Sequence, residues 1–279
     1  MKRHFDDIST KTAVSVTKKY STSFSMAVAL IDQSIRQDIH NVYGFVRVAD
    51  EIVDSFDGYP QKELLDRYEA ELWFALKHGI SSNIIINAFQ STVKKYDIPY
   101  DLIKAFLKSM RADLTKNVYT DQEGIDEYIY GSADVVGLMC LKIFVKGDET
   151  KYNLLQESAT KLGSAFQKVN FLRDLKQDFE DLDRTYFPNL DPANFSEIEK
   201  NQVIAEISED FRIAKEGINL LPKEARLGVY IAYKYYSVLL QKIKNTPASV
   251  LCGNRIRVSN SKKIRLLLQA SIKHKLNLI

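Results

Sequence analysis

The sequence predicts an all-α protein, and three observations point to this class. Apolar residues recur three or four positions apart over long stretches of the 279-residue chain, which is the spacing of helices with one buried face. Glycine and proline are scarce, with 11 and 6 occurrences, so few positions interrupt a helix. The alternating pattern and two-residue turns that mark β-strands are nearly absent.

The helical spacing is clearest in three segments, residues 64–79, 103–114 and 231–243, where an apolar stripe runs beside charged positions. Loop-forming residues separate the predicted helices at 57–60 (DGYP), 97–100 (DIPY), 145–149 (VKGDE), 187–196 (FPNLDPANFS) and 219–224 (NLLPKE). These breaks indicate roughly ten helices joined by short loops. No linker, repeat or low-complexity run divides them, so we expect a single domain over residues 1–279.

The composition argues against several classes of protein. A formal net charge of +3 is too small to indicate nucleic-acid binding, and we expect no nucleic-acid partner. Cys140 and Cys252 form no C-x-x-C pair, which argues against a thiolate metal site or a disulfide and fits a reducing cytoplasm. The first residues lack the apolar core of a signal peptide. The most apolar window, 135–145, is too short to span a bilayer, so we expect a cytoplasmic protein with at most peripheral membrane contact.

The stretch GFVRVADEIVDSF, residues 44–56, carries Asp50 and Asp54 one turn apart on an otherwise apolar helix. Like charges at this spacing repel each other, so the pair needs an explanation. Two further D-x-x-x-D patterns occur, but the one at 97–101 contains a proline that breaks the helical register. A single pair of this kind is most often a solvated helix face.

A second stripe of polar residues changes that interpretation. Spacings of three, four and four place on one helix face Gln167, Asn170, Asp174 and Asp178. Spacings of four, three and four do the same for Tyr43, Arg47, Asp50 and Asp54. Facing carboxylate and amide oxygens suit a hard cation such as Mg²⁺, with Mn²⁺ as a substitute. A bound cation would also neutralise the repelling charges on each helix.

Mg²⁺ held by a few carboxylates usually shares its coordination sphere with substrate phosphates. Candidate phosphate contacts are the hydroxyls of Ser21 and Ser23 and the guanidinium groups of Arg47, Arg173 and Arg255. Two alternatives stay open at this point. Ser21 can be a plain helix N-cap, and the basic segment 253–263 can be a solvated loop. Neither a P-loop nor a dinucleotide-binding glycine motif is present.

Five segments resemble the squalene and phytoene synthases, the head-to-head condensing enzymes of isoprenoid synthesis. They occur in the order and spacing of that family and cover nearly the whole chain: YSTSF, YGFVRVADEIVD, YIYGSADVVGLM, LGSAFQKVNFLRDLKQDFEDLDRTYFP and NRIRVSNSKK. The third and fourth segments look most like bacterial carotenoid-pathway members. One departure is Asp183, where many members of the family carry glycine.

The resemblance implies an isoprenoid-synthase helical bundle around a central cavity. It assigns Mg²⁺ binding to Asp50, Asp54, Asn170, Asp174 and Asp178, with the four aspartates catalytic. It assigns contact with the diphosphates or the reacting centre to Ser21, Ser23, Tyr43, Arg47, Gln167, Arg173 and Arg255. Tyr128 would face the reacting carbocation or the released pyrophosphate; ordinary packing with a hydrogen-bonded hydroxyl is the alternative.

A carbocation reaction needs a dry cavity, and apolar side chains are candidates for its wall. We expect these to be Phe24, Val46, Val53, Ala133, Val136, Gly137, Ala165 and Phe166. Gly137 and Gly163 lie inside predicted helices, where each is about 1 kcal/mol less favourable than alanine. Room for a prenyl chain would account for them.

The resemblance implies a 15-cis-phytoene synthase that condenses two geranylgeranyl diphosphates through a cyclopropylcarbinyl diphosphate, in carotenoid biosynthesis. The main alternative is a dehydrosqualene or squalene synthase acting on farnesyl diphosphate, and NADPH is not expected. A non-catalytic assembly or binding protein is a third interpretation, although all four aspartates are present. We expect a monomer. The cationic, apolar tail at 262–279 either forms a final bundle helix or touches an anionic membrane.

Overall fold

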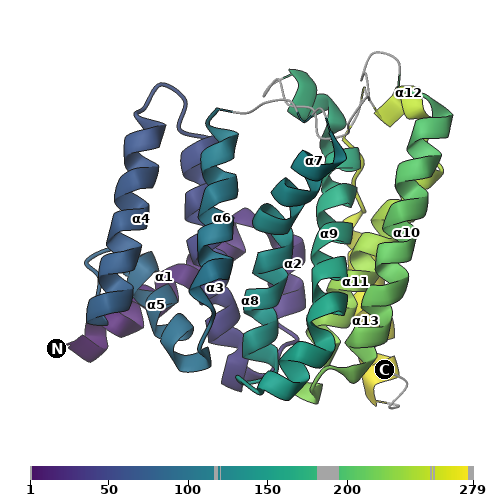
Figure 1. Ribbon diagram of the computed structural model, residues 1–279. Helices are drawn as coiled ribbons and strands as arrows, with labels where there is room; N and C mark the ends of the chain where they lie inside the picture. Colours follow the sequence, from purple (N-terminus) through teal and green to yellow (C-terminus); the bar gives the residue numbers. More distant parts are fainter. Residues whose placement is uncertain are drawn as a thin grey trace.

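The computed structural model describes residues 2–115, 119, 121–180, 195–251, 253 and 255–275. Within these ranges the side chains of residues 176–180, 260, 271 and 273–275 are not described. Every regular element over the described part of the chain is a helix, which confirms the predicted all-α class (Figure 1).

The helices follow one another along the chain with short connections. Their bounds are α1 Lys2–Tyr20, α2 Thr22–Val28, α3 Gln33–Asp54, α4 Gln61–His78, α5 Ile84–Tyr96, α6 Tyr100–Asp113, α7 Gln122–Ile129, η1 Tyr130–Asp134, α8 Val135–Phe144, α9 Glu149–Glu180, α10 Glu197–Leu220, α11 Lys223–Lys244, α12 Ala248–Leu251 and α13 Asn260–Lys275. The breaks predicted at 57–60, 97–100, 145–149 and 219–224 each fall at or beside a helix end. The segment η1 is a single π-helical turn between α7 and α8 that the sequence pattern did not reveal.

Local capping explains where several helices begin and end. Ser21 and Asp32 cap α2 and α3 by accepting hydrogen bonds from backbone N–H groups of the first turn. Ser196 and Glu199 form a capping box at the start of α10. Asp97 ends α5 with a left-handed φ of 50°. The two aspartates of the D-x-x-x-D pattern at 97–101 therefore belong to different helices, with Asp101 in α6.

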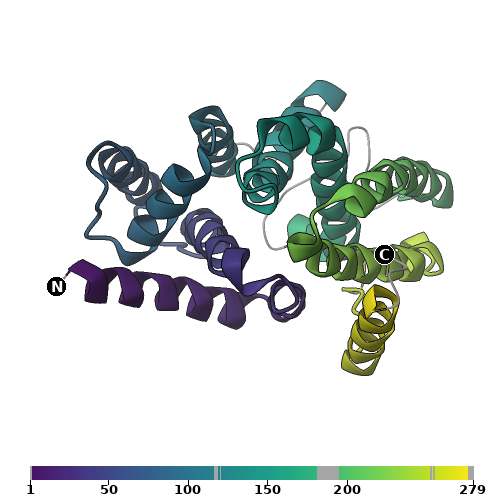
Figure 2. The same ribbon diagram turned by 90° about the horizontal axis from the view of Figure 1, so that it is seen from below.

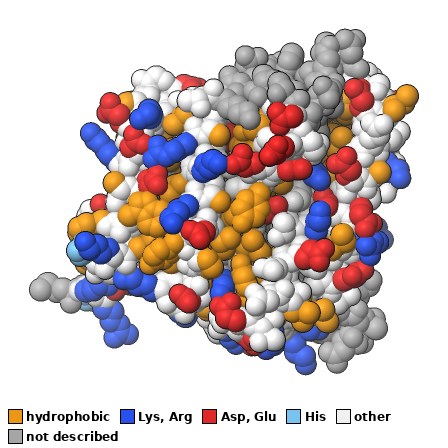
Figure 3. All heavy atoms as spheres, viewed as in Figure 1, with side chains coloured by type: hydrophobic (Ala, Val, Ile, Leu, Met, Phe, Trp, Pro, Cys, Tyr) orange, Lys and Arg blue, Asp and Glu red, His pale blue; other side chains and the backbone are white. Residues whose placement is uncertain are grey.

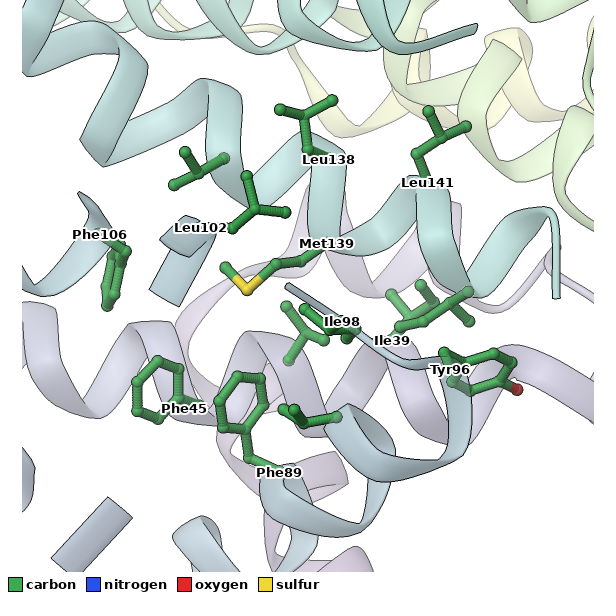
Figure 4. Close-up of a cluster of buried hydrophobic side chains, with 14 of the residues drawn as sticks. Ile39, Phe45, Phe89, Tyr96, Ile98, Leu102, Phe106, Leu138, Met139 and Leu141 are labelled. Carbon is green, nitrogen blue, oxygen red and sulfur yellow. The ribbon is translucent and has the colours of Figure 1, made fainter. Parts of the chain in front are cut away.

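One large hydrophobic core holds α3 against α5, α6 and α8, and Figure 4 shows its centre. Phe45 of α3 is fully buried and stacks on Phe89 of α5 with ring centroids 4.0 Å apart. Met139 of α8 lies in the same cluster. A second cluster packs α9 against α10 and α11. The core therefore holds the apolar face of α3, the helix that carries Asp50 and Asp54, and the polar stripe of this helix lies outside the core.

Close approach between helices explains two glycines. A Cβ atom on Gly163 of α9 would lie 2.9 Å from the Cα of Asp134 in η1. A Cβ on Gly137 of α8 would lie 3.1 Å from the carbonyl oxygen of Ala159 in α9. The close contact of η1 and α8 with α9 therefore requires both glycines. This contact accounts for them without the room for a prenyl chain that the sequence suggested.

Seen from below, α1–α6 lie on one side of the molecule and α10, α11 and α13 on the other, with α8 and α9 between these two groups (Figure 2). None of the described helices combines the length and apolar character needed to cross a membrane.

Candidate active site

A cavity of about 590 Å³ lies between the two groups of helices. Its wall is built mainly by α2, α3, η1, α8, α9, α10 and α11, with further side chains from α1, α6, α7 and the segment that carries Arg255. Six polar side chains gather at what we call the polar end of the cavity: Tyr43, Arg47, Asp50, Asn170, Arg173 and Arg255. The rest of the lining is mainly apolar. The two predicted polar stripes thus meet at one cavity.

On the α3 side, Arg47 holds the carboxylates in place. Its guanidinium donates to Asp50 Oδ2 at 2.6 Å and pairs with Glu51, and it lies 4.5 Å from the ring centroid of Tyr20. Asp54 is the last residue of α3 and is partly exposed, but it does not line the cavity. Glu51, off the stripe, is the better buried partner of Arg47, with a side chain 14% exposed against 36% for Asp50.

On the α9 side, Asp174 lies between two arginines. Arg173 Nε donates to its Oδ1 at 2.9 Å, and Arg255 Nε approaches the same oxygen at 2.8 Å. Asn170 and Gln167 line the cavity one and two turns before Asp174 in α9. Arg255 comes from the segment before α13, so this basic stretch is not merely a solvated loop. The side chain of Asp178 lies outside the described residues.

Electrostatics at the polar end keep the arginines charged. Burial alone would lower the pKa of Arg173, but the hydrogen bond and charge of Asp174 raise it above the ordinary value. The pKa of Arg47 is raised in the same way, because Asp50 and Glu51 outweigh its desolvation. Nε of Arg47 and Oγ of Ser132 are buried without a hydrogen-bond partner among the described residues. Such groups are rare in native proteins and fit a site that receives a polar ligand.

The donor set suits a hard cation in its chemistry. Asp50 and Asn170 in the wall, and Asp174 beside Arg255, offer oxygen ligands, and no histidine or cysteine is among the polar-end residues. Across the described residues, no group of three or more Asp, Glu, His or Cys side chains is close enough to hold an ion. The carboxylates are paired with arginines instead.

Ser21 and Tyr43 line the cavity, whereas Ser23 does not. Ser21 Oγ accepts a hydrogen bond from the N–H of Phe24 at 3.2 Å, so the N-cap interpretation is correct and coexists with a place in the wall. Tyr43 stacks on Phe24 with centroids 4.7 Å apart. Burial raises the pKa of Tyr43, although the charge of Arg47 lowers it.

Tyr128 lines the cavity and is also packed as an ordinary core residue. It is 6% exposed, and its hydroxyl donates to Asp113 Oδ2 at 3.2 Å. Its ring lies beside those of Tyr119 and Phe171. This packing with a hydrogen-bonded hydroxyl matches the alternative interpretation, and a role for Tyr128 at the reacting centre stays a prediction. Tyr130, the second tyrosine of the same motif, is 43% exposed and points away from the core.

Most of the predicted apolar wall lines the cavity: Phe24, Val46, Ala133, Val136, Gly137 and Phe166. The prediction was wrong for Val53 and Ala165. Val53 is buried in the large core and Ala165 in the cluster between α9 and α11. Val53 lies three residues after Asp50, and Ala165 lies directly before Phe166; both of those neighbours line the cavity. Spacing within the motif therefore could not distinguish cavity wall from core.

Tyr236 of α11 is a site residue that the sequence reasoning missed. Its hydroxyl donates to Asn170 Oδ1 at 3.1 Å, and its ring stacks on Phe166 at 4.0 Å. Burial raises its pKa, while Arg173 lowers it. The segment 231–243 showed only an amphipathic helix, because a tyrosine in such a helix gives no signal that it faces a cavity.

Comparison with known proteins identifies the family of the chain. The squalene/phytoene synthase family model matches residues 17–262. The chain is 26% identical to phytoene synthase 1 of Solanum lycopersicum, with 89% of the chain aligned, but it spans only 64% of that longer protein. It is 24% identical to 4,4'-diapophytoene synthase of Staphylococcus haemolyticus, covering 93% of this chain and 95% of that protein.

The fold also matches a solved structure. A dehydrosqualene synthase in complex with a ligand superposes with a TM-score of 0.83 at 21% identity, covering 97% of this chain and 98% of that one. This likeness concerns the fold, while the family model covers most of the sequence. The chain therefore belongs to the squalene/phytoene synthase family, whose members are prenyltransferases.

Proposed function

We propose that this protein is a 15-cis-phytoene synthase that condenses two molecules of geranylgeranyl diphosphate head to head. The observation that carries the proposal is the division of one cavity into an arginine–carboxylate end and an apolar remainder. A prenyl diphosphate has the same division, with an anionic head and a long hydrocarbon tail. The similarity to a phytoene synthase supports the choice of reaction.

Arg47, Arg173 and Arg255 would bind the diphosphate oxygens, because guanidinium groups match phosphate geometry with two parallel donors. Asp50, Asp54, Asn170, Asp174 and Asp178 would hold Mg²⁺ or Mn²⁺, a role in which oxygen donors fit. Bound Mg²⁺ would supply charge stabilisation for the departing diphosphate. Ser21 and Gln167 offer further polar contacts, whereas Ser23 lies outside the cavity lining.

The apolar wall would bind the prenyl chains and exclude water. When the allylic C–O bond of one substrate breaks, its electron pair leaves with the diphosphate and an allylic cation remains. The double bond of the second substrate then forms the new C–C bond, with proton loss closing a cyclopropane ring. A second C–O ionisation, rearrangement and a further proton loss give phytoene. The ring faces of Tyr43, Tyr128 and Tyr236 can stabilise these cations through their quadrupoles.

Dehydrosqualene synthesis from farnesyl diphosphate is the second candidate, and the similarity to a diapophytoene synthase favours it. Both reactions end in proton loss, so neither requires NADPH. Squalene synthase would require it.

Product identification tests the proposal. The purified protein is incubated with geranylgeranyl or farnesyl diphosphate, with and without NADPH, in Mg²⁺ or after chelation. We expect phytoene from the C20 substrate, no change with NADPH and no product after chelation. Dehydrosqualene as the main product would select the second candidate. Failure to release pyrophosphate from either substrate would contradict any synthase activity and favour a non-catalytic family member.

A further inference from the structure

The last helix, α13, presents two apolar faces, and only one is covered. It packs against α11, with Leu267 contacting the large core and Ala270 buried. On another face Ile264, Leu268 and Ile272 are 56%, 62% and 58% exposed. Their spacing of four places them in one stripe along the helix. Figure 2 shows α13 at the edge of the molecule, with α11 beside it.

The C-terminal part of the chain, which contains α13 and most of its neighbour α11, has side-chain charges of one sign. Residues 225–279 contain eleven Lys or Arg and no Asp or Glu. The whole chain has 39 Lys and Arg against 36 Asp and Glu, so the remainder is net acidic. Exposed cations in this part are Lys242, Lys244, Arg257, Lys262 and Arg265. By contrast, acidic and basic side chains are interspersed over the face shown in Figure 3.

An exposed apolar stripe on a helix surrounded by cations is typical of helices that lie in the surface of an anionic membrane. We propose that α13 docks on an anionic phospholipid bilayer, with Ile264, Leu268 and Ile272 inserted at the level of the headgroups. A second copy of the chain is a poorer occupant, because a symmetric contact would bring like charges together.

The docking surface is connected to the cavity through α11. That helix carries α13 on one side and contributes Val229, Ala232 and Tyr236 to the cavity wall on another. Resting on the proposed function, this arrangement would place the cavity one helix away from a membrane that can receive a hydrocarbon product.

Vesicle flotation tests the docking surface directly. The full-length protein is mixed with vesicles of phosphatidylglycerol or of phosphatidylcholine at low and high salt. We expect flotation with the anionic vesicles only, weakened by high salt because surface electrostatics are screened. The variant I264Q/L268Q/I272Q should bind at least about tenfold more weakly, since its apolar insertion is lost.

A matched control removes equally exposed apolar residues from other helices. L154Q/I198Q/L220Q changes side chains that are 67%, 72% and 60% exposed on α9 and α10, and it should float like the unmodified protein. Equal flotation with neutral vesicles, or an unaffected α13 variant, would overturn the proposal. A dimer in sedimentation velocity that the α13 variant abolishes, without vesicle binding, would assign the stripe to a second copy instead.

Synthase activity, assayed in detergent, is scored separately. A protein that floats but forms no product would contradict the proposed function and leave the docking surface standing. A protein that forms product but does not float would do the reverse.

Discussion

Asp50 of α3 and Asp174 of α9 are the carboxylates that pair with arginines at the polar end of the cavity. Each is paired with an arginine that a diphosphate could also bind. Neither belongs to a hydrophobic cluster, so their contribution to folding is small compared with that of Phe45 one turn earlier in α3. We therefore expect changes at Asp50 and Asp174 to affect activity, and changes at Phe45 to affect the free energy of unfolding.

Asp50→Asn and Asp174→Asn should each lower the rate of pyrophosphate release by about 100-fold or more, because a preorganised charge is lost where charge develops. The helical circular dichroism signal should be unchanged. Asp57→Asn, at an exposed position beyond the end of α3, is the matched control and should remain active. Unfolding of the two site variants would mean that these carboxylates are structural.

Gly163→Ala should lower the free energy of unfolding by about 1–3 kcal/mol, which is the range for overpacking. The added methyl group would meet backbone atoms of η1 at 2.9–3.0 Å, and backbone cannot turn aside as a flexible side chain can. Urea denaturation measures the effect. Gly253→Ala is the control, because its nearest neighbour would be 3.7 Å away and its stability should be unchanged. Equal stability of both variants would show that α9 and η1 can separate without loss.

The element that couples packing to chemistry most closely is η1, the single π-helical turn between α7 and α8. Single π-turns inside helices are often found at functional sites. This one places Ser132 and Ala133 in the cavity wall and turns Asp134 into the interior, where the hydroxyl of Ser164 donates to it at 2.8 Å. A π-turn leaves no trace in apolar spacing, and this is why the sequence did not predict it.

Burial raises the pKa of Asp134 to about 7, although the hydrogen bond from Ser164 lowers it. Since the folded protein binds this proton more tightly than the unfolded chain, the stabilisation is full below about pH 4 and is lost as pH rises through 7. Thermal unfolding between pH 5 and 8 should therefore show Asp134→Asn gaining stability over the unmodified protein as pH increases.

Ser164→Ala provides the complementary measurement. Removing the donor should raise the pKa of Asp134 further, because the hydroxyl favours the charged form. The pH range in which stability falls should then move upward. An unchanged profile in both variants would show that Asp134 does not titrate in this range.

Over the whole molecule, helices of both groups contribute to the cavity wall, so a ligand that contacts both groups should stabilise the fold. Pyrophosphate with Mg²⁺ should raise the melting temperature by several degrees, given that ligand at 100 times its Kd adds about 2.7 kcal/mol. Arg173→Gln should abolish the shift. Arg212→Gln, on the exposed face of α10, should retain it. A shift with Mg²⁺ alone would point to a metal site that does not need the diphosphate.

The sequence predicted the fold class and the meeting of two polar stripes because both depend on periodicity, which short-range spacing reveals. It could not assign Val53 and Ala165 correctly, because core and cavity wall are equally apolar and adjacent on one helix. The sequence also did not predict the contact of Tyr236 with Asn170 or that of Arg255 with Asp174. These contacts join residues 66 and 81 positions apart in the chain, and only the packing of α11 and α13 brings them to α9.

One face of α3 packs in the core and another lines the cavity, and this limits which substitutions the helix tolerates. Its inner face is occupied by Phe45 and its neighbours, so any substitution that reshapes that side also shifts the carboxylates. The helices α2 and α11 also belong to this core, and a Cβ atom on Gly228 of α11 would lie 2.5 Å from the side chain of Ile31. Ala133 and Ala232, by contrast, line the cavity without being fully buried. Variation in substrate length among relatives should therefore accumulate at such partly buried wall positions, while α3 stays nearly invariant.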